Sequence, residues 1–143
     1  MHKKRLSILF GLALFLVCYM GSAKAQEWMP KRIVGMDYPE LAASAKVQGQ
    51  VEISCTIKPD GSVVSAEVIG TAQPLLSDYA KENAMKWLFL DKNGSGQLGT
   101  FVLRYTFSFD GNLGHFSSQF VFEYPNRISI STGYRLVRTD KSE

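Results

Sequence analysis

Alternating apolar and polar residues on both sides of one tight turn constrain this chain more than any other feature. Between residues 50 and 58 the apolar positions are Val51, Ile53, Cys55 and Ile57. This period of two predicts a strand with one face in the core and one in solvent. Pro59-Asp60-Gly61 follows, in which Pro fixes φ and Gly supplies the left-handed residue that closes a hairpin. A return strand is predicted over residues 62–69, with its inward face formed by Val64, Ala66 and Val68.

Two helices are predicted on either side of this hairpin. Residues 38–47 have Pro39 suited to the first helical position, Glu40 complementing the dipole and Gly49 just beyond the end. The second helix is expected from Pro74 to about Trp87. Its apolar stripe recurs at helical spacing and consists of Leu76, Ala80, Ala84 and Trp87.

A third strand is predicted over residues 100–109 because its apolar residues again occupy every second position. They are Phe101, Leu103, Tyr105, Phe107 and Phe109. Beyond Gly111, the even spacing of residues 116–124 and the apolar residues Ile128, Ile130, Tyr134 and Leu136 indicate further β-structure. The sequence therefore favours an α+β fold with extra C-terminal β segments.

The N-terminus has the pattern of a secretory signal peptide. Basic residues 3–5 precede an apolar run over residues 6–20, and an A-x-A pattern ends at Ala25. Roughly fifteen apolar residues are short for a spanning helix, which needs about twenty. We expect export and cleavage before Gln26, with an uncleaved inner-membrane anchor as the alternative. A lipoprotein site at Cys18 is disfavoured because the bulky Val17 precedes it.

The charge balance excludes a basic nucleic-acid binder. The chain of 143 residues has a formal net charge of +3. Four of its 16 Lys and Arg residues and none of its 13 Asp and Glu residues lie in the first 25, which leaves 12 bases and 13 acids. Nucleic-acid-binding domains carry a concentrated positive field instead. The remaining 118 residues suit one domain.

The chemistry available after the signal peptide argues against an enzyme, a metal site or a bound cofactor. Cys55 is then the only cysteine, so it cannot form an intramolecular disulfide, and it lies on the apolar face of a predicted strand. His115 is the only histidine and lies in a turn. One Cys and one His cannot assemble a common zinc site, and no nucleophile-elbow pattern supports a Ser-His-Asp triad.

Five short motifs in one order resemble a known family. They are Tyr38-Pro39, Val47-Gln48-Gly49-Gln50-Val51, Pro59-Asp60-Gly61-Ser62-Val63, Leu75-Leu76-x-x-x-Ala80 and Ala84-x-x-Trp87-x-Phe89. Together they resemble the C-terminal domain of TonB, the periplasmic energy-transducing protein of Gram-negative bacteria, over about residues 36–111. The resemblance implies a three-stranded antiparallel sheet packed by two helices. It divides the chain into a signal peptide (1–25), an irregular lead segment (26–36), the TonB-like domain (37–111) and a β-rich extension (112–143).

The resemblance also implies a function. Family members bind an extended peptide, the Ton box of outer-membrane receptors, along the exposed edge of their last strand, where unpaired backbone groups can accept another strand. That strand is expected at residues 100–109. The side chains expected to contact the peptide are Thr100, Val102, Arg104, Thr106 and Ser108.

Several departures from the family leave alternatives open. The family's Gln-Pro-x-Tyr-Pro segment is Gly35-Met36-Asp37-Tyr38-Pro39 here, so the glutamine contact is missing. The Pro-rich spacer of full transducers is also absent, and the segment over residues 116–124 could itself pair with the third strand. The expectation is a periplasmic module that binds a peptide. The alternatives are a membrane-anchored energy transducer and an assembly protein whose edge is self-capped or paired in a homodimer.

Overall fold

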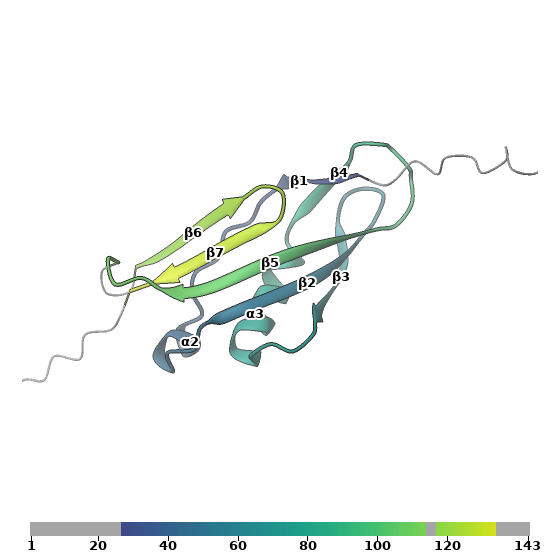
Figure 1. The fold of residues 1–143 in the computed structure, drawn as a ribbon. Coiled ribbons are helices and arrows are strands. Elements are labelled where there is room, and N and C mark those ends of the chain that lie inside the picture. Colours follow the sequence, from purple (N-terminus) through teal and green to yellow (C-terminus); the bar gives the residue numbers. More distant parts are fainter. Residues whose placement is uncertain (1–26, 114–116, 134–143) are drawn as a thin grey trace, which may run out of the picture.

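The computed structural model describes residues 27–113 and 117–133. The predicted signal peptide, His115, Tyr134 and Leu136 lie outside this part of the chain. The described residues form an α+β fold with two helices, a five-stranded sheet and a two-stranded ribbon (Figure 1). The five-stranded sheet has the order β3-β2-β5-β7-β6. Its strands are β2 (Gly49–Ile57), β3 (Val63–Ile69), β5 (Gly99–Phe109), β6 (Ser118–Glu123) and β7 (Arg127–Thr132).

The predicted hairpin is confirmed as β2 and β3, with one difference in its inward face. Gly61 has φ 91° in the turn, and a Cβ there would meet the Phe89 carbonyl oxygen at 1.9 Å, so the position requires glycine. A register shift between Thr56 and Ile57 places Val63, rather than Val64, opposite Ile57. In consequence Val63 is buried, whereas Val64, predicted to face inward, is 50% exposed.

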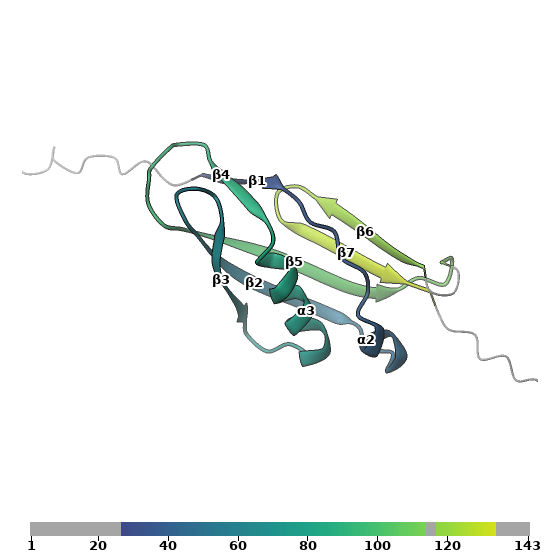
Figure 2. The same cartoon turned by 180° about the vertical axis from the view of Figure 1, so that it is seen from behind.

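Both predicted helices are present and shorter than expected. Helix α2 (Glu40–Ser44) begins after Pro39 and ends before Lys46, which has φ 53°. Helix α3 (Pro74–Ala84) buries Leu76, Ala80 and Ala84 as its spacing predicted. Trp87 lies beyond the helix end and is still buried. Figure 2 shows α3 across one face of the sheet, with α2 beside the start of β2.

The predicted antiparallel trio β3-β2-β5 is present, and the C-terminal extension widens it. Strand β5 pairs antiparallel with β2 along Gly49–Ile57. On its other side Arg104–Phe109 pair in parallel with β7, and β6 pairs antiparallel with β7. Thus Arg127–Thr132, rather than the segment 116–124 that was open as an alternative, lies against the third strand. The two C-terminal strands run along β5 on the side away from β2 (Figure 1).

A second, unpredicted pairing closes one end of the fold. The lead segment, predicted to be irregular, contains β1 (Trp28–Arg32), which pairs antiparallel with β4 (Leu88–Asp91). The Trp28 indole packs directly against the start of β5. A Cβ added to Gly99 would lie 1.8 Å from the indole Nε1. The sequence did not reveal this pairing because both strands are short, neither alternates clearly between apolar and polar residues, and they lie about sixty residues apart.

One buried amide links the layers of the core. Asn83 of α3 accepts hydrogen bonds at Oδ1 from the Tyr105 hydroxyl (2.9 Å) and from Nε1 of Trp87 (3.0 Å). Its Nδ2 donates to the Val34 carbonyl oxygen at 2.9 Å. Because an unpaired buried polar group is costly, this network fixes the lead segment, α3 and β5 relative to one another.

Candidate functional site

The outer edge of β5 is the predicted peptide site, and β7 lies along more than half of it. Arg104 donates its backbone N–H to the Asn126 carbonyl oxygen (2.9 Å), and Asp110 donates to that of Thr132 (2.9 Å). Backbone groups alternate in direction along a strand, so Arg104, Thr106 and Ser108 face β7. A peptide could add to this edge at these residues only after β7 had left.

The other two predicted residues, Thr100 and Val102, lie before the point where β7 begins. Neither is in register with β7. The Val102 carbonyl oxygen accepts a hydrogen bond from Asn126 Nδ2 at 2.9 Å. The part of the β5 edge that β7 leaves uncovered is therefore short. The turn between β6 and β7 already contacts this part at Val102.

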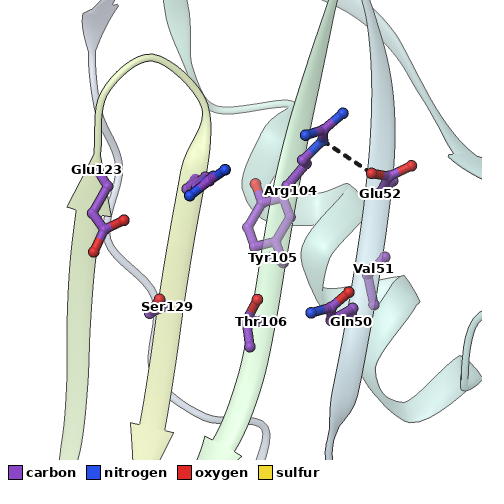
Figure 3. Close-up of a pocket in the computed structure, with 9 residues that line it drawn as sticks. Gln50, Val51, Glu52, Arg104, Tyr105, Thr106, Glu123 and Ser129 are labelled. Carbon is purple, nitrogen blue, oxygen red and sulfur yellow. Dashed lines mark ion pairs between the residues drawn. The ribbon is translucent and has the colours of Figure 1, made fainter.

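The side chains of all five predicted residues lie on the face of the sheet opposite the helices. The inward positions of β5 are occupied by residues such as Tyr105 and Phe107, which are buried. Arg104 and Thr106 project from the opposite face in Figure 3. The sequence alternation therefore assigned the faces of this strand correctly, although it could not show what pairs with its edge.

The sheet has two open edges among the described residues, β3 and β6. The hydrogen bonds of Asn126 and Thr132 show that even-numbered residues of β7 face β5, so odd-numbered ones face β6. The register then pairs Gln119, Val121 and Glu123 with β7. The backbone N–H and C=O groups of the intervening residues point away from the sheet; these residues are Ser118, Phe120 and Phe122.

Strand β6 offers the more regular of the two edges. Its register with β7 runs without a shift from Ser118 to Glu123. By contrast, β3 carries the irregularity opposite Thr56 and Ile57, and Ser62 at its start is bridged to Leu88 of β4. Bulges and covering segments protect strand edges from further pairing, so β6 is the edge better suited to accept a strand.

A shallow pocket of about 400 Å³ crosses the face opposite the helices. It spans β2, β5, β7 and β6 (Figure 3) and is lined by Gln50, Val51, Glu52, Arg104, Tyr105, Thr106, Glu123, Arg127 and Ser129. Arg104 Nε lies 3.0 Å from Glu52 Oε1, and both side chains are about half exposed. The lining is polar and charged, which suits contact with another polar surface better than enclosure of an apolar ligand.

Two of the buried ionisable groups in the described part of the chain are kept neutral by burial. Burial raises the pKa of the Cys55 thiol to about 12, so the thiol stays protonated and unreactive at neutral pH. Burial also raises the pKa of Tyr105, whose hydroxyl donates to Asn83. Within residues 27–113 and 117–133, no group of three or more His, Cys, Asp or Glu side chains could hold a metal ion. The same residues include no helix long and apolar enough to cross a membrane.

Sequence reasoning identified β-structure in the extension but not the β6 edge. Its signal was the even spacing of Phe120 and Phe122, which places both on the inward face. The parallel pairing of β7 left no trace in the sequence, because either β segment could have joined β5. Only the packing shows which strand lies at the outside.

Comparison with known proteins supports the resemblance inferred from the motifs. Residues 34–111 match the family model described as the Gram-negative bacterial TonB protein C-terminal. Among solved structures, the solution NMR structure of the Pseudomonas aeruginosa TonB CTD matches with 22% sequence identity and a TM-score of 0.43. The match covers 60% of this chain and 88% of that one. No curated protein matches the chain.

Proposed function

This chain belongs to the family of TonB C-terminal domains of Gram-negative bacteria, and on that premise we propose that it is a periplasmic module of TonB-dependent transport. It binds an extended peptide, such as the Ton box of an outer-membrane receptor, by adding it as a strand to its sheet. The observation that carries the proposal is the unbroken, outward-facing edge of β6 on a domain of this family.

Among the described residues, addition at β6 requires no strand to leave. The β5 edge, where the sequence places Thr100, Val102, Arg104, Thr106 and Ser108, would need β7 to be displaced over its second half. Ile128 and Ile130 of β7 are 1% and 0% exposed. Exposing each would cost about 1.5–3 kcal/mol of hydrophobic stabilisation, before any hydrogen bonds are exchanged. A peptide therefore gains more by pairing with β6.

The pairing of β7 with β5 also favours a second candidate function. In this alternative, the hairpin of β6 and β7 caps the sheet permanently, and the protein acts in assembly, alone or as a homodimer joined through β6. Self-capping of this kind is a common way to protect a strand edge. It predicts no binding of receptor peptides by the monomer.

Backbone-amide NMR titration of residues 26–143 with Ton-box peptides distinguishes the two candidates. Saturable shifts over Ser118–Glu123 are expected for addition at β6. Shifts over residues 100–108, with faster exchange of the β7 amides, would instead mean that the peptide displaces β7. Unchanged spectra, together with slow amide exchange in β5, would refute peptide binding and favour the self-capped alternative.

A matched pair of variants tests whether the backbone of β6 carries the binding. Phe120→Ala and Phe120→Pro both remove the half-buried ring, but only proline removes the outward N–H. Binding retained by Phe120→Ala and lost by Phe120→Pro is expected. Equal affinities in two folded variants would contradict strand addition at this position.

Export is part of the same proposal and has its own test. Intact-mass analysis of the protein from an envelope fraction should give a chain that begins at Gln26. A mass corresponding to a chain that begins at Met1 would favour the anchored energy transducer.

A further inference from the structure

Four charged residues form one row across the face of the sheet opposite the helices. Glu52 is in register with Arg104, Arg104 with Arg127, and Arg127 with Glu123. The row thus reads acid, base, base, acid from β2 to β6, and Figure 3 shows Glu52, Arg104 and Glu123 on their three strands. Directly opposite residues on one face interact, and unlike charges there are favourable whereas like charges are not.

The two ends of this row differ. At the β3 end, the residue in register with Glu52 is Ile69, which is uncharged. At the β6 end, the row stops at Glu123, an exposed carboxylate on the open edge. Among the described residues, Glu123 has no ion pair within 4 Å, and its only charged neighbour in the row is Arg127. A strand added to β6 would therefore place a side chain beside this carboxylate.

The rest of β6 defines the two faces that an added strand must match. Gln119, Val121 and Glu123 lie on the charged face, and Ser118, Phe120 and Phe122 lie on the inward face. Phe122 packs against Trp87 with ring centroids 5.5 Å apart. An apolar side chain of the added strand would extend this inward layer, while a polar one would face the solvent.

On these grounds, and resting on strand addition at β6 as proposed above, we infer that this edge selects strands of one chemistry. The preferred strand alternates apolar and polar residues and carries Lys or Arg opposite Glu123. The charge of Glu123 thus acts as a specificity determinant, and the backbone of β6 supplies the affinity.

Three capped peptides that differ in one charge provide the test. Each has six residues that alternate Thr and Val, and the first Thr, which lies opposite Glu123 when the peptide pairs antiparallel along Ser118–Glu123, is replaced by Lys, Gln or Glu. The alternation fixes which peptide face meets Phe120 and Phe122. Titration into the full-length ¹⁵N-labelled chain, followed at the β6 amides, gives three dissociation constants. The Lys peptide should bind about two- to fivefold more tightly than the Gln peptide, and the Glu peptide should bind more weakly by a similar factor.

Charge reversal in the protein gives the matched control. Glu123→Lys should invert the order of the three peptides. Glu67→Lys makes the same change of charge on the same face at the opposite edge, where Glu67 of β3 is in register with Ser54, and should leave the order unchanged.

Each outcome decides a different point. Shifts at β6 with equal affinities for all three peptides would overturn the charge selectivity and leave strand addition standing. Tighter binding of the Glu peptide by the unmodified chain would overturn it in favour of Arg127 as the determinant. The absence of β6 shifts with every peptide would overturn both this inference and the function on which it rests.

Discussion

The two neighbours of β5 are held to it in different ways. Strand β2 pairs antiparallel along Gly49–Ile57, inside the segment that matches the family model. Strand β7 pairs in parallel along Arg127–Thr132, outside that segment. On the β2 side, α3 covers the sheet and Asn83 joins Tyr105 and Trp87 through directed hydrogen bonds. On the β7 side, the contacts are the strand ladder, buried apolar residues and two hydrogen bonds, from Asn126 Nδ2 to the Val102 carbonyl oxygen and from the Tyr38 backbone N–H to Ser118 Oγ.

This difference indicates that the hairpin of β6 and β7 is the less strongly anchored part. Its fully buried side chains are Ile128 and Ile130, and Thr132 donates its hydroxyl to the Ser117 carbonyl oxygen at 3.0 Å. A segment with fewer buried contacts opens at lower free energy than the core. We therefore expect the family-matched part to determine global stability, and the hairpin to determine what can reach the β5 edge.

Trp87 contacts both parts, and its truncation should have the largest effect. The side chain is 1% exposed and packs against Phe89 and Phe122. Trp87→Ala should lower the free energy of unfolding by about 3–5 kcal/mol, measured by urea denaturation. Trp87→Phe keeps a ring and removes the hydrogen bond to Asn83, so it should cost less. A loss under 1 kcal/mol in Trp87→Ala would show that the two parts are not joined here.

Two fully buried isoleucines on opposite sides of β5 test whether the hairpin opens separately from the family-matched part. Ile53 of β2 and Ile130 of β7 are both 0% exposed, and truncation of either to Ala should cost about 2–5 kcal/mol locally. Ile53→Ala should speed amide exchange throughout the sheet, whereas Ile130→Ala should speed it mainly in β6 and β7. Equal acceleration everywhere in both variants would mean that the hairpin and the core unfold as one unit.

Gly99 tests the start of β5, before the point where β7 pairs with it, without touching the hairpin. A Cβ at this position would lie 1.8 Å from Trp28 Nε1. Gly99→Ala should therefore lower stability by about 1–3 kcal/mol through displacement of the indole, as seen by thermal unfolding. Gly111→Ala is the matched control, since a Cβ at Gly111 would meet nothing within 4 Å. Similar melting temperatures for the two variants would argue against the close packing of Trp28.

The smallest expected effect concerns the turn between β2 and β3 and depends on pH. Hydrogen bonds from the Ser62 hydroxyl (2.6 Å) and backbone N–H (2.9 Å) hold the pKa of Asp60 below its ordinary value. A carboxyl group whose pKa is depressed on folding stabilises the protein above its unfolded pKa of about 3.9, and that contribution is lost as pH falls through the folded pKa.

The Asp60→Asn variant should therefore lose less stability than the parent chain between pH 5 and pH 3. The check is the urea midpoint at both values. Parallel pH profiles for the two proteins would show that the Ser62 contacts do not depend on the charge of Asp60.

Local patterns in the sequence determined much of the family-matched part. The alternation over Val51–Ile57 and Phe101–Phe109, the Pro-Asp-Gly turn and the helical spacing of Leu76, Ala80 and Ala84 each depend on neighbouring residues, so each could be identified without the fold. The same patterns assigned the two faces of β5. The inward assignment of Val64 was wrong because a register shift reverses the faces, and such a shift depends on the partner strand.

Tertiary structure alone decided what lies beside the β5 edge. Three features depend on residues that are far apart in the chain. They are the choice of β7 as the neighbour of β5, the pairing of β1 with β4, and the alignment of Glu52 and Arg104 with the Arg127–Glu123 pair. Such pairings depend on the competition between strands for hydrogen bonds and for burial of their apolar faces, which is a property of the whole fold. The periodicity of a segment gives its faces, but not its neighbours.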